Sequence, residues 1–551
     1  MNKMSSTALV TTKEPQKGRH VLRAAWEAIF CFIADTLHAF LCLPDVLSDM
    51  RRRSLQPLGA KQVLVIVLAN LLVVTAFGGY LLLRLPDAAN TFFACSLPLC
   101  FCVLVPLCYF ASSCRGDGVF ALTVCVLIVL GTVLRVMLAA SSQQYNVTAK
   151  GLLITNLLSM FGGAVGFVFF CALLRMRTSN AAALLCLLSV VCYLLLCLFG
   201  SSPNGAQAKA WLVFGNADSG ISFQLTEVGK LLGAASMALA LNDRDRSGLG
   251  RVCTSFAILA GHALFLALLG EFGTLLVLIL TYLCLLVIFL PSAAELKRSS
   301  LLKVIGAVLA AALVVAIFSV VACLRANGSK VAVLKQIRTA DSAQATADAG
   351  DAVTIDEKIA DACQADKERA KTLNPLVNRF GNEVWKITCR FLAMRSNYKG
   401  LSDEQLIALG VNNWQLRKNN MGAATGGWFG KDGQLDSFAM SVAESDYAFS
   451  WACRSIGGVG AIIVLLLFLM LLVRGNRRLG AMQDRAEMAV AYSFLHAIVC
   501  QAFICMAANL NLLPAVGLPM AFLSEGKANS IICFVMVLFL LYAGRKEGSY
   551  K

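Results

Sequence analysis

The segment Trp451–Val473, WACRSIGGVGAIIVLLLFLMLLV, decides the fold of this chain. A helix needs about 20 apolar residues to cross a bilayer, and this segment supplies that length. Asp446 lies shortly before it, where a watery loop meets hydrocarbon and a helix begins. Asp446 is therefore either a helix cap, which short acidic side chains favour, or a partly desolvated general base with a tunable pKa.

The composition indicates an all-α polytopic membrane protein. Of the 551 residues, 58% are hydrophobic and 15% are charged, and the mean hydropathy is +0.72. Soluble domains contain roughly 45–50% apolar and about 25% charged residues. The net charge of +16 is concentrated in short loops between apolar segments, which is typical of a membrane protein and not of a nucleic-acid-binding one.

Most of the 21 cysteines lie inside the apolar segments, where cysteine acts as a small hydrophobic residue. No CxxC pair has a histidine partner, so we predict no zinc site. Cys363 and Cys389 lie in the one large loop and would be able to form a disulfide if that loop is extracytoplasmic. The N-terminus has no cleavable signal of the usual shape.

The length criterion predicts about twelve membrane spans. Their ranges are 61–84, 91–112, 118–140, 152–175, 181–200, 222–241, 252–270, 273–291, 302–324, 451–473, 489–510 and 528–544. A mixed apolar and acidic segment at 24–43 is expected to lie in the membrane interface as an amphipathic helix. The chain thus divides into a cytoplasmic tail with this helix (1–60), N-terminal membrane helices (61–200), a membrane core in two parts (201–324 and 451–551) and a large loop (325–450).

The distribution of basic residues predicts the orientation. Loops on the predicted cytoplasmic side contain Arg51–Arg53, Arg175, Arg177, Arg244, Arg246, Arg251, Lys297, Arg298, Lys303, Arg474, Arg477, Arg478, Arg545 and Lys546. The short loops on the other side contain only Arg84, Lys150, Lys209 and Lys527. By the positive-inside rule, both termini are expected in the cytoplasm, and Asp446 and the large loop outside it.

The second half of the large loop is aromatic and basic. From Arg417 to Lys431 there are three basic residues and no acidic one. Such a patch suits an anionic partner such as a lipid pyrophosphate or the membrane surface, and a solvated loop is the alternative. Gly426 and Gly427 in the same stretch either let backbone approach a ligand closely or form a turn.

Two places near the outer ends of spans carry ionisable residues. Glu227 and Lys230, in SFQLTEVGKLLG, share a helix face and can neutralise each other. They mark either a functional site or a structural ion pair, because charges at membrane depth are costly. Glu271, in the turn GEFGT, is either a polar tip or a second carboxylate on the face that carries Asp446.

The loop NLNLLPAVGLPMAFLSEGKANS, residues 509–530, contains Pro514, Gly517, Pro519 and Gly526. This density of proline and glycine predicts non-helical backbone, which is tolerated near a membrane where protein or a watery cavity covers it. We interpret it as a re-entrant loop lining a cavity, with a surface loop as the alternative. Trp211 is expected to belong to the interfacial aromatic belt.

The order of these motifs is more specific than any one of them. The chain contains WLxxG, FQxxExxK, an acidic GT turn, GGxxGK, DxxFxxxxxxxGxxG and NxxxLPxxGxPxxxxSxG in that order. Over roughly residues 205–545 this series resembles the SEDS family of FtsW, RodA and SpoVE. Asp446, Phe449, Gly457 and Gly460 fall in step with the family's TDFIF…GxxG segment, and Asn509 or Asn511 begins the closing motif.

Several positions depart from the family pattern. QPSE is QLTE here, from Gln224 to Glu227, and QPDLGT becomes GEFGT. Arg454 and Ser455 stand where the family has an acidic pair, and YGGSS becomes EGKANS. The family has ten spans, with three before the Trp-containing loop, where this chain has five. The resemblance therefore implies a divergent member with two additional N-terminal spans.

The resemblance implies a peptidoglycan glycosyltransferase that polymerises lipid II. Its catalytic aspartate falls on Asp446, which would accept the proton of the attacking sugar hydroxyl. The residues expected to bind substrate are Gln224, Glu227, Lys230, Glu271, Arg417, Gly426, Gly427, Lys431, Pro514, Gly517, Pro519 and Ser524. Cations among them would stabilise the pyrophosphate leaving group, and Mg²⁺ or Mn²⁺ would suit the same chemistry.

The family's usual partner is a single-span class B penicillin-binding transpeptidase, which the resemblance implies here as well. We predict no nucleic-acid partner and a location in the bacterial cytoplasmic membrane. Two alternatives stay open: a lipid II transporter, which would need functional charges near mid-membrane and repeat symmetry, and a non-catalytic scaffold for division, elongation or sporulation.

Overall fold

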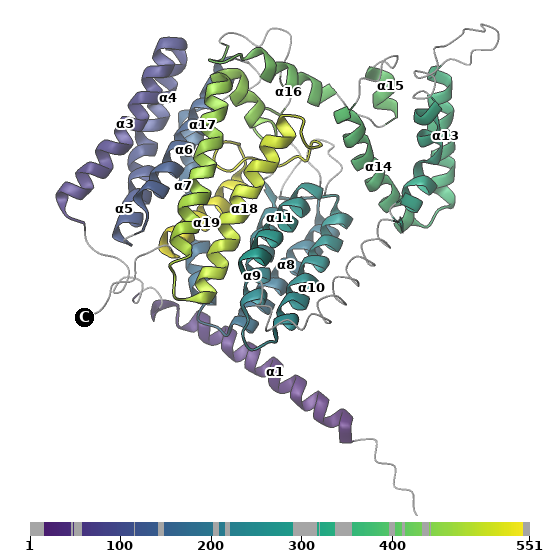
Figure 1. Ribbon diagram of the computed structural model, residues 1–551, viewed down its shortest axis with the longest axis horizontal. Helices are drawn as coiled ribbons and strands as arrows, with labels where there is room; N and C mark the ends of the chain where they lie inside the picture. Colours follow the sequence, from purple (N-terminus) through teal and green to yellow (C-terminus); the bar gives the residue numbers. More distant parts are fainter. Residues whose placement is uncertain are drawn as a thin grey trace, which may run out of the picture.

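The structure is a computed structural model that describes residues 16–45, 48, 58–114, 116–141, 148–201, 209–214, 221–289, 317–318, 320–336, 355–395, 403–409, 414–431, 440 and 442–543. Most described residues form a bundle of roughly parallel helices, with further helices beside one end (Figure 1).

The helices of the bundle follow the predicted spans closely. They are α3 (Ala60–Arg84), α4 (Pro86–Leu99), η1 (Cys100–Leu104), α5 (Val105–Ser113), α6 (Gly118–Ser141), α7 (Ala149–Leu173), α8 (Thr178–Phe199), α9 (Leu225–Asn242), α10 (Gly248–Leu269), α11 (Phe272–Phe289), α17 (Ala448–Leu479), α18 (Arg485–Asn509) and α19 (Lys527–Ala543). Among the described residues, nine helices are long and apolar enough to span a membrane. The protein is therefore a polytopic helical membrane protein, as predicted.

Three of the predicted spans form helices that are not simple apolar helices of membrane-crossing length. The second span is one helical stretch, Pro86–Ser113, with a π-helical segment, η1, in its middle. Proline removes a backbone donor, and Pro98 and Pro106 flank this irregular turn. α9 is too polar to qualify by hydropathy because it carries Glu227 and Lys230, and α19 is slightly too short. The predicted span 302–324 lies mostly outside the described residues.

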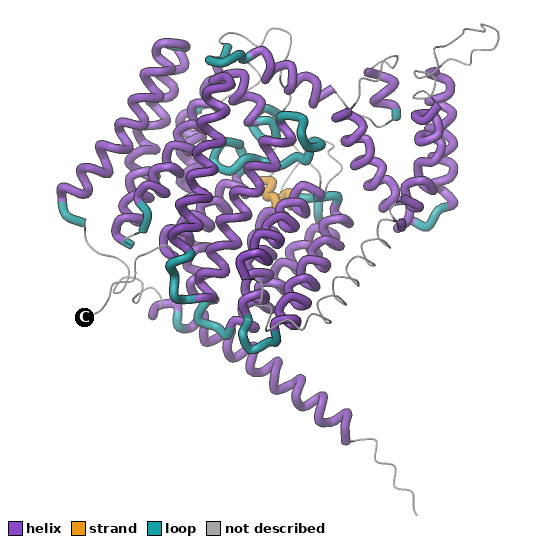
Figure 2. The backbone as a smooth tube through the Cα atoms, viewed as in Figure 1, coloured by secondary structure: helices purple, strands orange, loops and turns teal. Residues whose placement is uncertain are grey.

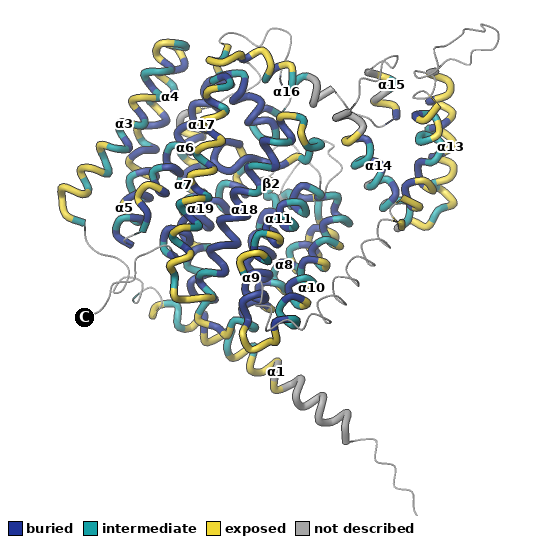
Figure 3. The backbone as a smooth tube through the Cα atoms, viewed as in Figure 1, coloured by how far each residue is buried: buried dark blue, intermediate teal, exposed yellow. Residues whose placement is uncertain are grey.

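Burial separates a central group of helices from peripheral ones (Figure 3). Within the most apolar 18-residue stretch of each helix, 83% of the residues are buried in α6 and α18, against 17% in α3. α9 packs against α8, α10, α11 and α18, which explains why its charged residues are enclosed by protein. α3 and α4 pack on each other at the edge of the bundle and leave most of α3 exposed.

The segment predicted to lie in the interface is a helix, α1 (Gln16–Leu41), and it is not among the membrane-length helices. It lies across one end of the bundle and touches α7 and α8 (Figure 1). Asp35 accepts hydrogen bonds from the backbone N–H of Arg177 (3.2 Å) and the amide of Asn180 (2.8 Å). These bonds join α1 to the N-terminal end of α8.

A short β-hairpin interrupts the all-helical pattern. β1 (Trp211–Phe214) pairs antiparallel with β2 (Ile221–Gln224), so that Trp211 lies opposite Gln224 (Figure 2). Neither strand is predicted from the sequence, where Trp211 is expected only in the interfacial aromatic belt. Aromatic and β-branched residues favour strands, but two four-residue strands give too short a pattern to separate from a loop.

The large loop contains helices of its own: a segment at 320–336, α13 (Ile355–Thr372), α14 (Pro375–Arg395), α15 (Asp403–Ala408) and α16 (Trp414–Thr425). Trp385 and Cys389 of α14 form an apolar cluster with neighbours that include Tyr447, next to Asp446. The disulfide considered for Cys363 and Cys389 is absent, since both cysteines are free. Cys363 instead donates to the carbonyl of Ala408, and Cys389 is buried in the apolar cluster.

Candidate active site

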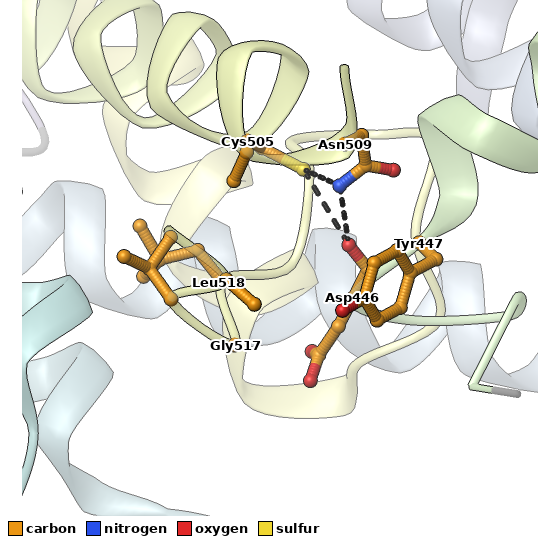
Figure 4. Close-up of a pocket in the computed structure, with 9 residues that line it drawn as sticks. Asp446, Tyr447, Cys505, Asn509, Gly517 and Leu518 are labelled. Carbon is orange, nitrogen blue, oxygen red and sulfur yellow. Dashed lines mark hydrogen bonds between the residues drawn. The ribbon is translucent and has the colours of Figure 1, made fainter. Parts of the chain in front are cut away.

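A small pocket opens beside Asp446 at the start of α17 (Figure 4). Its lining combines Asp446 and Tyr447, the end of α18 (Cys505, Ala508, Asn509) and the following loop (Ala515, Val516, Gly517, Leu518). The space between atoms is about 210 Å³, open solvent included. The cavity volume that can be compared with the roughly 300–1,000 Å³ of small-molecule pockets is only about 10 Å³, so this conformation is nearly closed.

Asn509 fixes the backbone that presents the aspartate. Its side-chain amide donates to the carbonyl of Asp446 (2.9 Å), and its side-chain oxygen accepts from the backbone N–H of Ser450 (2.9 Å). The Ser450 hydroxyl adds a bond to the same oxygen (3.2 Å). One amide from α18 therefore holds the turn before α17 and also satisfies an N–H at the start of that helix.

This geometry rules out the capping interpretation of Asp446. Tyr447 occupies the N-cap position of α17 and provides no side-chain cap, while Asn509 supplies the oxygen that a cap would supply. Among the described residues, the Asp446 carboxylate makes no hydrogen bond or ion pair. It faces the glycine of the neighbouring loop, where a Cβ built on Gly517 would lie 3.5 Å from Asp446 Oδ2 (Figure 4).

The loop after α18 is tied to the segment before Asp446 by short hydrogen bonds. The Ser524 hydroxyl donates to the carbonyl of Ser445 (2.6 Å) and accepts from the N–H of Met520 (2.6 Å). The N–H of Glu525 donates to the carbonyl of Glu444 (2.6 Å). The predicted non-helical loop thus lines the pocket, and its backbone polar groups find protein partners as the burial requires.

Burial is the main influence on the acids of the site. Burial, with a smaller contribution from the charge of Glu444, raises the pKa of Asp446 to about 6 against the opposing charge of Arg390. Burial also raises the pKa of Glu271 to about 7, with contributions from Glu227 and Asp446, while Thr274 and Arg390 lower it. A carboxylate with a pKa near 6 is largely ionised at neutral pH and still basic enough to accept a proton.

Glu227 and Lys230 form a buried structural network and do not line the pocket. Both side chains are fully buried and form an ion pair. Lys230 also donates to Gln501 Oε1, and the Gln501 amide donates to the carbonyl of Pro519 (2.6 Å) and to Asn529 (3.1 Å). The network joins α9, α18, α19 and the loop that lines the pocket, and contact of this pair with substrate stays a prediction.

The glycine-rich turn GGWFGK packs on α17. A Cβ on Gly426 would lie 2.1 Å from the carbonyl oxygen of Cys453, so this glycine is required by packing against the helix. Gly427 has φ +60° and open space around it, which fits a turn. Lys431 is exposed, and Arg417 lies in α16 with a side chain outside the described part of the chain.

The other predicted binding residues are spread around the pocket. Gly517 lines it, and Pro519 and Ser524 are buried supports of the same loop. Pro514 is partly buried in the same loop, immediately before the pocket-lining residues. Gln224 ends β2, immediately before α9, and Glu271 is buried directly before α11. None of these placements tests whether the residues touch substrate, which stays a prediction.

Comparison with known proteins finds a match in the C-terminal part of the chain. Residues 396–548 match the cell cycle protein family FtsW/RodA/SpoVE. The matched region is 153 of the 551 residues. It contains Asp446, the pocket and the closing loop, whereas the motifs before residue 396 lie outside the match.

Curated relatives carry the same family name. Proteins named probable peptidoglycan glycosyltransferase FtsW are 28% identical over 162 residues in Geobacter metallireducens, covering 27% of this chain and 42% of that protein, and 32% identical over 135 residues in Legionella pneumophila, covering 23% and 34%. The chain thus matches less than half the length of these relatives.

Two solved structures are similar over most of the chain. One comes from a study of a peptidoglycan synthase complex that coordinates polymerization and crosslinking (TM-score 0.49, 16% identity, 79% of this chain and 99% of that one). The other is a mutant of the rod shape determining protein RodA from Thermus thermophilus (TM-score 0.43, 16% identity, 79% and 99%).

Three residues of the site were not among the predicted ones. Arg390 of α14 is exposed and acts electrostatically on Asp446, Glu271 and Tyr447. Glu444 adds a negative charge two residues before Asp446. Arg84 of α3 binds the glycine-rich turn. Glu444 was visible as a neighbouring acid, but nothing in the sequence links the two arginines to Asp446.

The carboxylates also bear on the divalent cation that the family resemblance implies. Among the described residues, no group of three or more His, Cys, Asp or Glu side chains forms a preassembled metal site. Mg²⁺ is usually held by one or two carboxylates together with substrate phosphates. Asp446 and Glu271 would fit that role, because both are buried acids and Asp446 is close enough to raise the pKa of Glu271.

Proposed function

We propose that the protein is a peptidoglycan glycosyltransferase that polymerises lipid II at the outer face of the cytoplasmic membrane. The observation that carries the proposal is the Asp446 carboxylate. It lies at the family's aspartate position, opens onto a pocket, and has a pKa raised to about 6. The match to FtsW-like relatives over residues 396–548 supports the reaction class.

In this reaction Asp446 accepts the proton from the 4-hydroxyl of the acceptor sugar while that oxygen attacks the anomeric carbon of the lipid-linked strand. A new glycosidic bond forms, and the bond to the lipid pyrophosphate breaks. The leaving group carries away the bonding electrons and requires positive charge nearby. Arg390, which already acts on the acids of the site, is the described cation best placed to supply it, with Lys431 as a second candidate.

Substrate entry requires the pocket to open, because its present space is too small for a lipid-linked sugar. Two elements can move. One is the loop at 514–518, which Gln501 holds next to its C-terminal end through the carbonyl of Pro519. The other is α14, which covers the site from the large loop. Either movement would expose Asp446 to a groove that is open to lipid.

The proposed orientation places Asp446 outside and the Arg474–Arg478 end of α17 in the cytoplasm. α17 runs through the bundle between these two ends, so the positive-inside pattern applies to it directly. A single-span class B transpeptidase is the proposed partner. The role in division, elongation or sporulation is left open in this proposal.

The test is polymerisation of labelled lipid II by purified protein, with glycan strands separated by size. Wild type is expected to form polymer, and Asp446→Ala to lose it. Asp361→Asn, an exposed acid of α13, is the matched control and should retain activity. Absence of polymer from folded wild type would favour the transporter or scaffold alternatives, which lipid II transport into vesicles and partner binding then separate.

A further inference from the structure

The outer part of α17 is two helical segments separated at Gly457, whose φ is 72° and ψ is −173°. Such a break leaves carbonyls at the end of the first segment and N–H groups at the start of the second without helical partners. Buried backbone groups need partners, so another part of the chain must supply them.

The glycine-rich turn supplies partners for three of them. Gly458 N–H donates to the carbonyl of Gly427 (2.9 Å), and Val459 N–H to that of Trp428 (3.1 Å). In return, Lys431 N–H donates to the carbonyl of Arg454 (2.9 Å). The turn therefore forms hydrogen bonds to the broken helix on both sides of the break.

Arg84, the last residue of α3, binds both the glycine-rich turn and the broken helix. Its guanidinium donates to the carbonyls of Phe429 (2.7 Å) and Gly430 (3.1 Å) in the turn, and to Ser455 (3.2 Å) at the end of the first helical segment. A planar fork of several donors can bind three carbonyls at once, which a lysine cannot reproduce.

The glycine-rich turn and the break in α17 are packed so closely that neither backbone has room to shift toward the other. A Cβ on Gly457 would lie 2.3 Å from Gly430 N, and a Cβ on Gly430 would lie 2.1 Å from the carbonyl oxygen of Ser455. The turn and the break are thus in direct backbone contact, and Arg84 bonds to both partners.

The braced segment, 448–456, begins two residues after Asp446. It carries Ser450, which bonds Asn509, and Asn509 holds the carbonyl of Asp446. The angle of this segment therefore sets where the Asp446 carboxylate lies relative to the pocket.

We infer that Arg84 is a positioning residue for Asp446, and that the α3–α4 helix pair braces the active-site segment through it. The inference rests on the proposed function of Asp446. It also gives a role to α3, which otherwise lies at the lipid-facing edge of the bundle with few buried residues. Arg84 contacts main-chain carbonyls outside the pocket lining, so its effect on the reaction is indirect.

Hydrogen exchange on the full-length protein in lipid nanodiscs tests the brace without any activity. In Arg84→Ala, exchange in peptides covering 426–431 and 454–460 should become about tenfold faster or more, as expected for loss of charge-assisted hydrogen bonds. Arg84→Lys should fall between. The control is Leu83→Ala on the same helix end, where the side chain is 88% exposed and should change nothing.

Activity separates positioning from substrate contact. With lipid II, Arg84→Ala should lower kcat about tenfold and leave KM unchanged, with partial recovery in Arg84→Lys. Unchanged exchange in Arg84→Ala overturns the inference, and so does a raised KM with unchanged kcat. If wild type makes no polymer, the proposed function fails, while the exchange result still decides whether the brace exists.

Discussion

Two aspartates at opposite ends of the bundle show how differently this chain uses the same side chain. Asp117, before α6, accepts hydrogen bonds from the N–H groups of Val119 (2.9 Å) and Phe120 (3.1 Å) and from Arg474 (2.8 Å). Arg478 lies 3.6 Å from its other oxygen. Asp446, before α17, has its backbone fixed by Asn509, but its carboxylate has no such partner among the described residues.

Their pKa values diverge accordingly. Burial alone would raise the pKa of Asp117, but hydrogen bonds from Arg474 and Phe120 and the charges of both arginines hold it below its ordinary value. Burial raises the pKa of Asp446 to about 6 because little compensates it. Under the proposed function, Asp117 serves the fold and Asp446 serves chemistry, and each prediction below tests that division.

The largest expected effect is on catalysis. Asp446→Asn should reduce lipid II polymerisation by about 10²–10⁴-fold, the usual contribution of a general base, and leave the melting temperature near that of wild type. Asp117→Asn should do the reverse: lower the free energy of unfolding by about 1–3 kcal/mol and retain polymerisation at permissive temperature. Both are measured by strand assay and thermal unfolding in detergent. Equal loss of activity in the two variants would contradict the division.

The next effect concerns Arg390. Its charge lowers the pKa of Asp446, as the charge of Arg474 lowers the pKa of Asp117, but the effect is weaker. Arg390→Ala should lower kcat about 10²-fold if this charge stabilises the pyrophosphate leaving group. It should also raise the pKa of Asp446, since the arginine lowers it, and so move the acidic limb of the pH–rate profile upward. Lys386→Ala, four residues earlier on α14, is the control. An unshifted limb would show that Arg390 does not reach Asp446.

The smallest effect is on stability and comes from Glu271, the second buried acid on the Asp446 side. Its pKa is raised to about 7, so folding favours the protonated form and stability falls as pH rises from about 4.5 to about 7. Glu271→Gln should therefore stabilise the protein at pH 8 by ~2 kcal/mol and have little effect at pH 5. Thermal unfolding at both values measures it, and a stabilisation independent of pH would contradict the assignment. Asp117 should behave oppositely, losing its contribution only as pH falls below about 3.8.

The sequence was sufficient for the features that local pattern encodes. Hydrophobic length predicted the helix that begins near Trp451, and the proline and glycine density after α18 predicted the irregular loop that lines the pocket. The position of Asp446 just before a span followed from the same pattern. Glu227 and Lys230 were correctly paired by their spacing, but their burial away from the pocket could not be deduced from one helix.

Contacts between distant parts of the chain were out of reach. Arg84 binds carbonyls more than 340 residues later, and its neighbours on α3 give no sign of this partner. Arg390 reaches the site only because Trp385 and Cys389 dock α14 against Tyr447. The capping role of Asn509 needed the end of α18 to meet the start of α17, which only tertiary packing decides.

The most direct test of the central claim is the pH dependence of a single round of glycan transfer, followed with saturating labelled lipid II so that binding is not limiting. If Asp446 is the base, the rate should rise with pH through an apparent pKa near 6 and reach a plateau above it. Asp446→Asn should lose both the transfer activity and this rise with pH. A wild-type rate that is flat between pH 5 and pH 8 would contradict the account.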